Sequence, residues 1–233
     1  MLKAIFLDLD HTLCDTDGID EQAYAHTMTL AVKAAPELDP EQLRRDYHGL
    51  LVRQPFPPDP TMPVNVWRTG FWRMALGAQS ADTKELPTYL HDSYYNFRNS
   101  IVCFRPGVPE MLSKLRKQWK LIIVTNGPAS IQRPKLEVCK ADDYCDGIIV
   151  SGEQSYQKPD AGIFQLACKM AGCEAAEAVH VGDDLEKDIQ GGINARLAAT
   201  IWLAPADAPA SPMPKPTHII TDILDLPALA AQV

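Results

Sequence analysis

The sequence is short of several features that mark special classes of protein. No apolar run approaches the roughly 20 residues that a membrane-spanning helix requires, so no membrane partner is expected. No CxxC pair is present, which argues against a zinc ribbon. The composition, 46% hydrophobic and 22% charged, is instead that of an ordinary globular protein.

Basic residues are also in the minority. Thirty acidic residues stand against 22 basic ones, which gives a formal net charge of −8, and the basic residues are scattered along the chain. A nucleic-acid surface needs basic residues gathered on one face. We therefore expect no nucleic-acid partner.

Export features are missing at the start of the sequence. Residues 1–16 lead almost directly into a strand, without a cationic segment, a signal-type apolar region or a small-residue cleavage site. The expected location is therefore the cytoplasm. The cysteines are irregularly spaced, and in that compartment we expect reduced, mostly buried thiols. The six are Cys14, Cys103, Cys139, Cys145, Cys168 and Cys173.

The length of 233 residues is enough to bury a full core in one large domain, or in one domain with an insertion. Neither arrangement needs a partner chain in order to fold. We therefore expect a monomer or a small homo-oligomer.

The first feature that indicates chemistry is an apolar run and the acids that end it. Residues 1–16 read MLKAIFLDLDHTLCDT, in which a run typical of a buried parallel strand leads to Asp8 and Asp10. Side chains two residues apart lie on the same face of a strand. Two carboxylates placed in this way repel each other unless a cation or a proton lies between them.

Helical patterns fill the next part of the chain. Apolar residues recur at helical spacing, and a proline cluster over residues 55–63 divides the pattern into two halves. No strand-like run interrupts residues 17–98, so we interpret this span as a helical insertion. The predicted helices span 20–35, 39–53, 64–78 and 86–97.

From Ile101 onward, strand and helix patterns alternate. This alternation predicts a parallel sheet with helices on both faces, a three-layer α/β fold of the Rossmann type. One helix is opened by Pro109, and a last strand-like piece and a short helix fall within 217–233. The other predicted strands span 120–127, 146–153, 178–184 and 199–204, and the other predicted helices 130–140, 160–171 and 185–195.

The first four predicted strands of the core end in polar residues. Ligands of open α/β sheets bind beyond the carboxyl ends of the strands, so these residues are candidates for a site. Carboxylates, one lysine and a hydroxyl with an amide suit Mg²⁺ and a phosphate, because Mg²⁺ takes one or two carboxylates and leaves another free to attack phosphorus. The candidates are Asp8, Asp10 and Thr12; Thr125, Asn126 and Gly127; Ser151, Gly152, Glu153, Lys158 and Pro159; and Gly182, Asp183, Asp184 and Asp188.

Four short motifs carry a family resemblance. DLDHT at 8–12, VTNG at 124–127, QKPD at 157–160 and VGDDLEKD at 181–188 resemble the four ordered motifs of the haloacid dehalogenase superfamily. The helical insertion after the first motif resembles the cap of the C1-capped subfamily I. The resemblance implies a Rossmann-like catalytic core of residues 1–16 and 99–233 and a helical C1-type cap of residues 17–98.

The resemblance also implies roles for the aspartates. Asp8 matches the nucleophile that becomes an aspartyl phosphate, and Asp10 matches the general acid that protonates the leaving alcohol and later activates water. Asp183 matches a ligand of Mg²⁺, joined by Asp8 and by the backbone carbonyl of Asp10. The implied cofactor is therefore Mg²⁺.

The remaining motif residues are implied to hold the phosphate or to support the site. Thr125 matches the phosphate-binding hydroxyl, with Asn126 beside it, and Lys158 matches the lysine of the third motif, which also assists catalysis. Thr12 and Asp188 are expected to be supporting residues, Asp188 through water or through Lys158.

The resemblance implies a Mg²⁺-dependent phosphatase that acts on a small phosphorylated metabolite, a sugar phosphate or a nucleotide. Haloacid dehalogenases proper lack an acid at the place of Asp10 and use no metal, so Asp10 and Asp183 favour phosphatase chemistry. The C-terminal motifs are most similar to the branch that contains N-acylneuraminate-9-phosphatases and bacterial nucleotidases and sugar phosphatases. Two alternatives remain open, a phosphomutase with the same core and a metabolite-binding regulator without turnover.

Other polar residues have simpler interpretations. Asp184, Glu186 and Lys187 fit an exposed first helical turn, and Gly191 with Gly192 fits close packing of a helix against the sheet. In the predicted cap, Trp67, Phe71 and Trp72 fit the core of that unit, whereas four nearby cationic or histidine side chains could contact a substrate. These four are His48, Arg53, Arg68 and Arg73.

Overall fold

The computed structural model describes residues 1–57, 59, 61–81 and 84–232. The chain divides into two compact units, one formed by Met1–Thr16 with Val102–Val233 and the other by Asp17–Ile101. The second unit extends past residue 98 because its last helix, α4 (Leu86–Ile101), continues to Ile101. Each unit has a hydrophobic core of its own.

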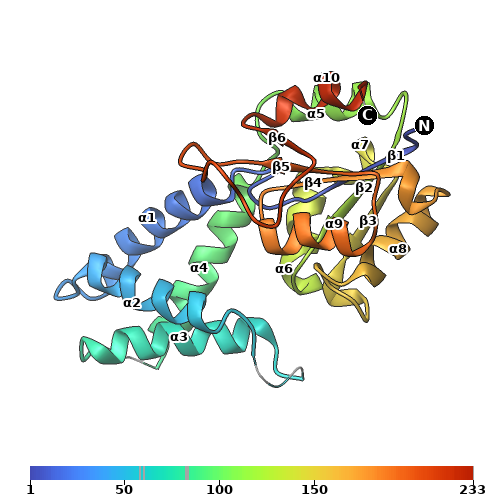
Figure 1. Ribbon diagram of the computed structural model, residues 1–233. Coiled ribbons are helices and arrows are strands. Elements are labelled where there is room, and N and C mark those ends of the chain that lie inside the picture. The colour runs from blue at the N-terminus through green and yellow to red at the C-terminus, as the bar shows by residue number, and fades with distance from the viewer. Residues whose placement is uncertain (58, 60, 82–83, 233) are drawn as a thin grey trace. The chain divides into compact units, whose positions relative to one another are not determined.

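The first unit is built on a parallel sheet in the order β3-β2-β1-β4-β5-β6 (Figure 1). Every neighbouring pair is parallel, and β1 lies between β2 and β4, with Ala4 aligned to Lys120 on one side and to Ala178 on the other. The predicted parallel α/β fold is therefore confirmed. The strands are β1 (Ala4–Leu7), β2 (Lys120–Thr125), β3 (Gly147–Val150), β4 (Ala178–Gly182), β5 (Ala199–Leu203) and β6 (His218–Ile220).

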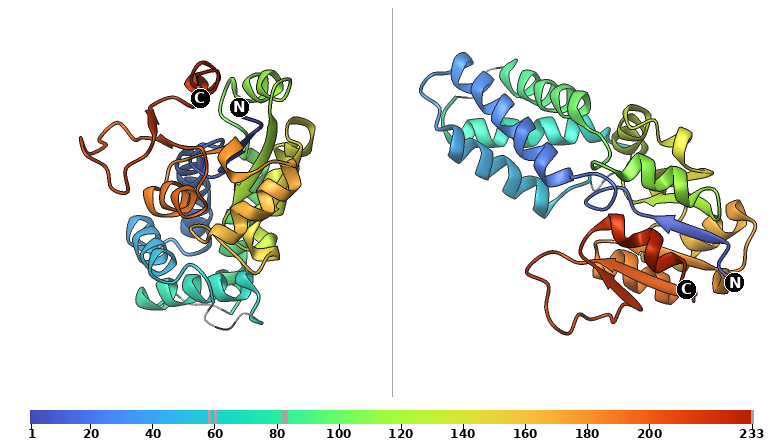
Figure 2. Two further views of the ribbon diagram at one scale, coloured as in Figure 1. Left: turned by 45° about the vertical axis from the view of Figure 1, so that its right-hand side comes forward. Right: turned by 90° about the horizontal axis from the view of Figure 1, so that it is seen from above.

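Helices cover both faces of this sheet. α8 and α9 lie on one side and α5 and α10 on the other (Figures 1 and 2), so the described part of the unit has three layers. Parallel strands covered in this way are buried on both faces, which explains why β1 reads as an unbroken apolar run. The helices are α5 (Val108–Leu115), α6 (Ala129–Val138), α7 (Ala141–Tyr144), α8 (Ala161–Ala171), α9 (Gln190–Asn194) and α10 (Leu226–Ala230).

Several predicted elements differ from the observed ones in their bounds, and two of them also contain a turn of a different type. The strand expected at 146–153 ends at Val150, and Ser151–Glu153 form a short 3₁₀ turn. The single helix expected over 185–195 begins as a π-helical turn, Leu185–Ile189, before α9. The wider turn buries Asp188, and wide turns of this kind are frequent at functional sites.

The paired glycines of α9 pack closely, as expected. A Cβ on Gly191 would lie 2.7 Å from the ring of Phe164, and a Cβ on Gly192 would lie 2.5 Å from Thr200. Both distances are too short for a real side chain. The glycines therefore let α9 approach α8 and β5.

In its described residues, the second unit has four helices around an aromatic core. The rings of Tyr47 and Trp72 stack with centroids 3.8 Å apart, and Phe71 and Tyr94 are buried around them. Phe71 and Trp72 are therefore core residues, as the sequence indicated, and Trp67 packs partly buried against them. The helices are α1 (Thr16–Ala34), α2 (Pro40–Arg53), α3 (Val64–Ala78) and α4.

None of the described helices is both long and apolar enough to cross a membrane. All six cysteines are free, and four of them are buried. The buried pair Cys14 and Cys139 lies with its sulfur atoms 3.8 Å apart.

Candidate active site

The polar residues predicted from the strand ends gather at the carboxyl edge of the sheet. Asp8 follows β1 directly, Thr125 is the last residue of β2, and Asp183 follows β4. Because β1 lies between β2 and β4, these three positions are neighbours although they are far apart in sequence. Lys158 reaches the same edge from the loop that precedes α8.

Lys158 is the centre of a buried charge network. Its Nζ atom lies 2.5 Å from Oδ1 of Asp8 and 2.6 Å from Oδ1 of Asp188, and all three side chains are buried. Burial lowers the pKa of Lys158, but the carboxylates of Asp188 and Asp8 outweigh burial and leave that pKa above its ordinary value. Lys158 is therefore held as a cation.

The backbone of Lys158 is fixed by Asn126. The Asn126 side-chain amide donates to the carbonyl oxygen of Lys158 at 2.8 Å, and its Oδ1 accepts the N–H of Lys158 at 2.9 Å. These two bonds tie the end of β2 to the loop that carries the lysine. The side chain predicted to contact phosphate thus supports Lys158 in this structure.

Asp188 is the second acid that Lys158 contacts. Its Oδ1 lies 2.9 Å from Nε2 of the buried His180, and its Oδ2 accepts the backbone N–H of Asp184. Burial raises the pKa of Asp188, but Lys158 and His180 outweigh burial and hold that pKa well below its ordinary range. Burial also lowers the pKa of His180, so this imidazole is neutral at pH 7.

Gly182 provides the room that Asp188 occupies. A Cβ on Gly182 would lie 2.2 Å from Cγ of Asp188. Because the Asp188 carboxylate cannot move without losing its partners, we expect Gly182→Ala to lower the free energy of unfolding by about 1–3 kcal/mol, the usual cost of overpacking. Chemical denaturation measures the difference.

Gly70→Ala is the control for this prediction. Gly70 lies inside α3, and a Cβ there would meet nothing within 4 Å. Removing a glycine from a helix interior should increase stability by about 0.5–1 kcal/mol. If the free energy of unfolding of Gly182→Ala were no lower than that of Gly70→Ala, the close packing of Asp188 against Gly182 would be contradicted.

Three carboxylates come together around Asp8. Asp8, Asp183 and Asp188 each offer an oxygen within 4.8 Å of the others. Burial raises the pKa of Asp8 to about 8, with Lys158 opposing the rise and the other two acids adding to it. Burial and Asp188 likewise raise the pKa of Asp183. With His180 neutral, three carboxylates face one ammonium group, which leaves an excess of two negative charges when all are ionised.

This donor set fits a divalent cation. Hard cations such as Mg²⁺ prefer carboxylate oxygens, and two positive charges would balance the excess negative charge. Thr12 supports one of the acids, because its hydroxyl donates to Oδ1 of Asp183 at 3.3 Å. The Asp183 carbonyl accepts the indole N–H of Trp202 at 2.7 Å, which fixes the backbone at this acid.

Asp10 belongs to a separate set of contacts at the same edge. Its carboxylate lies 2.7 and 2.8 Å from Nζ of Lys135, and it accepts further hydrogen bonds from Gln132 and Thr16, each at 2.8 Å. Its carboxylate is not one of the three that offer oxygens within 4.8 Å of one another. A contact of Asp10 with a metal through its backbone carbonyl remains a prediction.

Comparison with known proteins identifies the family. The model of the haloacid dehalogenase-like hydrolases matches residues 2–196. The chain belongs to this family of hydrolases. As a member of the haloacid dehalogenase-like (HAD-like) family, it carries the four motifs that the sequence suggested, and the carboxyl edge of its sheet brings them together.

Relatives of this HAD-like hydrolase include a phosphatase and a nucleotidase. The chain is 34% identical to the N-acylneuraminate-9-phosphatase of Rattus norvegicus, over 100% of this chain and 95% of the relative. It is 37% identical to the pyrimidine 5'-nucleotidase YjjG of Escherichia coli (strain K12), over 50% of this chain and 52% of the relative. Among solved structures, a 2-haloacid dehalogenase from Pseudomonas syringae pv. Tomato DC3000 superposes with a TM-score of 0.71 and 26% identity, over 100% of this chain and 99% of that chain.

Four residues that bind the carboxylates of Asp10 and Asp188 were missed from the sequence. Thr16, Gln132 and Lys135 bind Asp10, and His180 binds Asp188. A signal for two of them was present, because Gln132 and Lys135 are three residues apart and lie on the same helix face as the buried Leu136. Polar residues on an otherwise apolar helix face indicate a buried polar partner.

The predicted cap residues lie in the helical unit and have partners there. Arg68 donates to the Tyr95 hydroxyl and to the Pro55 carbonyl, and Arg53 donates to a carbonyl of its own helix. Nδ1 of His48 lies 3.4 Å from the Tyr24 hydroxyl oxygen. The side chain of Arg73 is exposed. A role for these residues in substrate binding remains a prediction.

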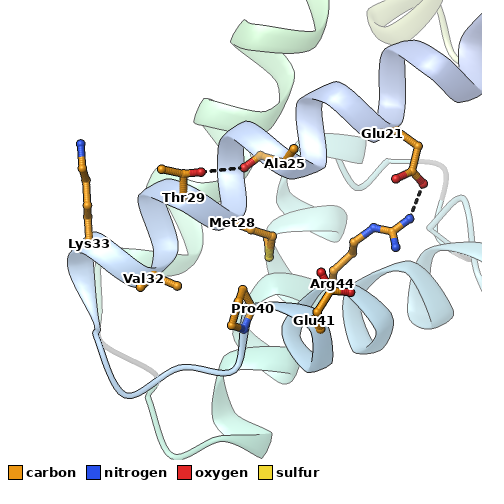
Figure 3. A pocket seen from close by; sticks show the side chains of 9 residues that line it. All are labelled: Glu21, Ala25, Met28, Thr29, Val32, Lys33, Pro40, Glu41 and Arg44. Carbon is orange, nitrogen blue, oxygen red and sulfur yellow. Dashed lines mark hydrogen bonds and ion pairs between the residues drawn. The ribbon is translucent and has the colours of Figure 1, made fainter.

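The helical unit contains a cavity of about 560 Å³ between α1 and α2 (Figure 3). Met28 of α1 and Pro40 of α2 line it, and the ion pair between Glu21 and Arg44 joins the two helices beside it. None of the carboxylates or lysines of the strand-end cluster lines this cavity.

Proposed function

We propose that this protein is a magnesium-dependent phosphatase that hydrolyses the phosphomonoester of a small metabolite through an aspartyl-phosphate intermediate. The observation that carries the proposal is the buried Asp8, hydrogen-bonded to Lys158 at the end of the central strand, with the clamped carboxylate of Asp10 two residues on. Asp8 and Asp10 lie in different environments, which suits two different roles, nucleophile for Asp8 and general acid for Asp10.

In the first half-reaction, an Asp8 carboxylate oxygen attacks phosphorus, and the bond from phosphorus to the leaving oxygen breaks. Asp10 gives a proton to that oxygen, so the alcohol departs neutral. Lys158 and the hydroxyl of Thr125 donate to the phosphoryl oxygens, and Asn126 contributes by holding the backbone of Lys158.

In the second half-reaction, Asp10 takes a proton from water, and the water oxygen attacks phosphorus of the aspartyl phosphate. The bond from phosphorus to the Asp8 oxygen breaks, which releases inorganic phosphate and restores Asp8. Asp10 thus acts first as an acid and then as a base. Its proton count returns to the starting value after each cycle.

Asp8, Asp183 and Asp188 are the residues whose side chains would hold Mg²⁺. When bound, Mg²⁺ would offset the charge of these acids and of the phosphoryl group and so favour the ionised form of Asp8. Thr12 holds Asp183, while His180 and Lys158 hold Asp188.

The substrate class follows from the relatives and from the helical unit. The match to N-acylneuraminate-9-phosphatase runs along the whole chain, which favours a phosphorylated sugar over a nucleotide. The match to the pyrimidine nucleotidase covers half of the chain. We assign the helical unit the role of the C1-type cap, which selects the leaving group, while residues of the sheet unit carry out phosphate chemistry.

The test is phosphate release from a panel of sugar phosphates, nucleotides and other phosphomonoesters, with purified protein and Mg²⁺. We expect turnover of at least one sugar phosphate, loss of activity with EDTA and recovery with added Mg²⁺. Recording ³¹P spectra of the same reactions distinguishes free phosphate from an isomerised ester, which a phosphomutase would produce. No phosphate release from any member of the panel would count against the proposal.

Release of halide from 2-haloacids is a second readout for the same protein. A dehalogenase structure superposes on the whole chain, but the carboxyl group of Asp10, which accepts four hydrogen bonds, has a use in protonating an alkoxide leaving group. A halide ion needs no proton in order to leave, so a dehalogenase would have no use for a general acid at Asp10. We therefore expect no halide release.

A further inference from the structure

Two residues of α6 contact the carboxylate of Asp10. Lys135 and Gln132 lie one helical turn apart, and their side chains point to the same acid at the end of β1. Both are nearly inaccessible to solvent, with exposed fractions of 4% for Lys135 and 1% for Gln132. Neither residue belongs to the four motifs.

The contacts fix both oxygens of the Asp10 carboxylate. Lys135 Nζ lies 2.7 Å from Oδ1 and 2.8 Å from Oδ2, and Gln132 donates to Oδ2 at 2.8 Å. An ammonium group that contacts both oxygens, with an amide on one of them, restricts rotation of the carboxylate as well as its position. Thr16 donates to the remaining side of Oδ1 at 2.8 Å.

Gln132 also connects Asp10 to the predicted phosphate-binding residue. Its Nε2 donates to the hydroxyl oxygen of Thr125 at 2.5 Å. Because the Thr125 oxygen accepts this bond, its own hydrogen is directed elsewhere and is available for a phosphoryl oxygen. In the ionised form that follows proton transfer, the Asp10 carboxylate can only accept, which requires the NH₂ side of the Gln132 amide to face it.

A lysine at this position is not needed for packing. Burying an ammonium group costs free energy, and an apolar side chain of similar length would fill the same space without that cost. The same holds for Gln132, which occupies a helix face that also buries Leu136. The polar pair therefore calls for an explanation in the chemistry of Asp10.

We propose that Lys135 and Gln132 form a clamp that positions Asp10 for proton transfer to the leaving group, and that Gln132 aligns Thr125 with the same site. This inference rests on the role proposed for Asp10. Lys135 and Gln132 are positioning residues, since they act through Asp10 and Thr125.

The experiment compares two phosphate esters whose leaving groups differ in how much they depend on protonation by a general acid. An alkyl phosphate releases an alkoxide and depends on the general acid, whereas p-nitrophenyl phosphate releases a stable anion and does not. The readout is kcat/KM, which reports on the steps up to cleavage of the ester bond. Asp10→Asn serves as the reference and should lose far more activity on the alkyl ester than on p-nitrophenyl phosphate.

For Lys135→Met we also expect kcat/KM to fall more on the alkyl ester than on p-nitrophenyl phosphate, but by a smaller factor than in Asp10→Asn. The loss on the alkyl ester should be about 10–100-fold, part of the roughly 10²–10⁴-fold that a positioned acid supplies, and the loss on p-nitrophenyl phosphate less than about threefold. Combining Lys135→Met with Asp10→Asn should add little, because both changes act on one function. A burst of p-nitrophenolate before steady state should appear in both single variants, since water attack on the intermediate also needs Asp10.

Arg133→Met is the matched control on the same helix. Arg133 binds Glu153 on the exposed side of α6, and its loss should leave both substrates unaffected. An equal loss on both esters in Lys135→Met would indicate a structural role only and would overturn the clamp, as would full activity on the alkyl ester. If Asp10→Asn itself showed no leaving-group selectivity, the assignment of Asp10 as the acid would fail instead. Thermal unfolding of each variant separates these results from loss of the fold.

Discussion

Asp8→Asn is expected to lower phosphate release by roughly 10⁴-fold or more, the order observed when a covalent nucleophile is removed. The amide of asparagine has nearly the shape of the carboxylate but cannot form the aspartyl phosphate. Lys158 keeps its contact with Asp188, so the site should stay assembled. Steady-state phosphate release measures the effect, and mass spectrometry of acid-quenched protein should show a phosphorylated adduct for the native chain only.

The same substitution should change the pH dependence of stability in metal-free protein. Burial raises the pKa of Asp8 to about 8 in the folded state, against about 3.9 in the unfolded chain. Between these values the folded state keeps a proton that the unfolded state has lost, so the native chain loses stability as the pH rises. The amide that replaces the carboxyl group in Asp8→Asn does not titrate, so the variant is free of this loss.

In EDTA, the native protein should therefore lose at least about 1.4 kcal/mol relative to Asp8→Asn between pH 5 and pH 8, the equivalent of one pKa unit. Urea denaturation at the two pH values measures the difference. Saturating Mg²⁺ should stabilise the native chain more than the variant, because the variant lacks one carboxylate ligand. If the free energy of unfolding changed with pH in the same way for both proteins in EDTA, the raised pKa of Asp8 would be contradicted. Full activity of Asp8→Asn would exclude Asp8 as the nucleophile.

Lys158→Met is expected to lower the free energy of unfolding by about 3–5 kcal/mol, as well as to abolish turnover. Removing the ammonium group leaves Asp8 and Asp188 buried without the cation that both contact. Breaking a buried ion pair by deleting one partner typically has this cost, because an uncompensated charge remains inside the protein. Urea denaturation without metal is the measurement.

Lys187→Met provides the matched control. Lys187 lies in the fourth motif and pairs with Asp184, but its side chain is 54% exposed. An exposed pair contributes no more than about 1 kcal/mol, so this variant should resemble the native protein. At alkaline pH, where Asp8 ionises, adding Asp8→Asn to Lys158→Met should recover part of the lost stability, since it removes one of the two carboxylates left without a cation. Equal stability of the two lysine variants would be incompatible with the buried network.

The sequence was sufficient to predict the parallel sheet and the place of the site. Buried parallel strands appear as apolar runs, and their carboxyl ends meet at one edge whatever lies between them in the chain. For this reason Asp8, Thr125, Lys158 and Asp183 could be grouped in advance. Their roles in catalysis remain proposals.

The contacts around the site could not be predicted in the same way. Lys135 and Gln132 reach Asp10 only because α6 turns one face toward the end of β1, and a helical pattern does not say which distant residue that face meets. His180 was hidden inside an apolar strand pattern. The amide of Asn126 turned out to bind the backbone of Lys158, a contact set by the path of a loop.

The place of β1 in the sheet also affects how the protein folds. This strand precedes the helical unit of residues 17–101 in the chain, whereas its neighbours at Lys120 and Ala178 follow that unit. Joining segments so far apart carries an entropic cost that contacts within the helical unit do not. We expect the helices to form early during synthesis, while the strand that carries Asp8 waits unpaired until β2 and β4 emerge.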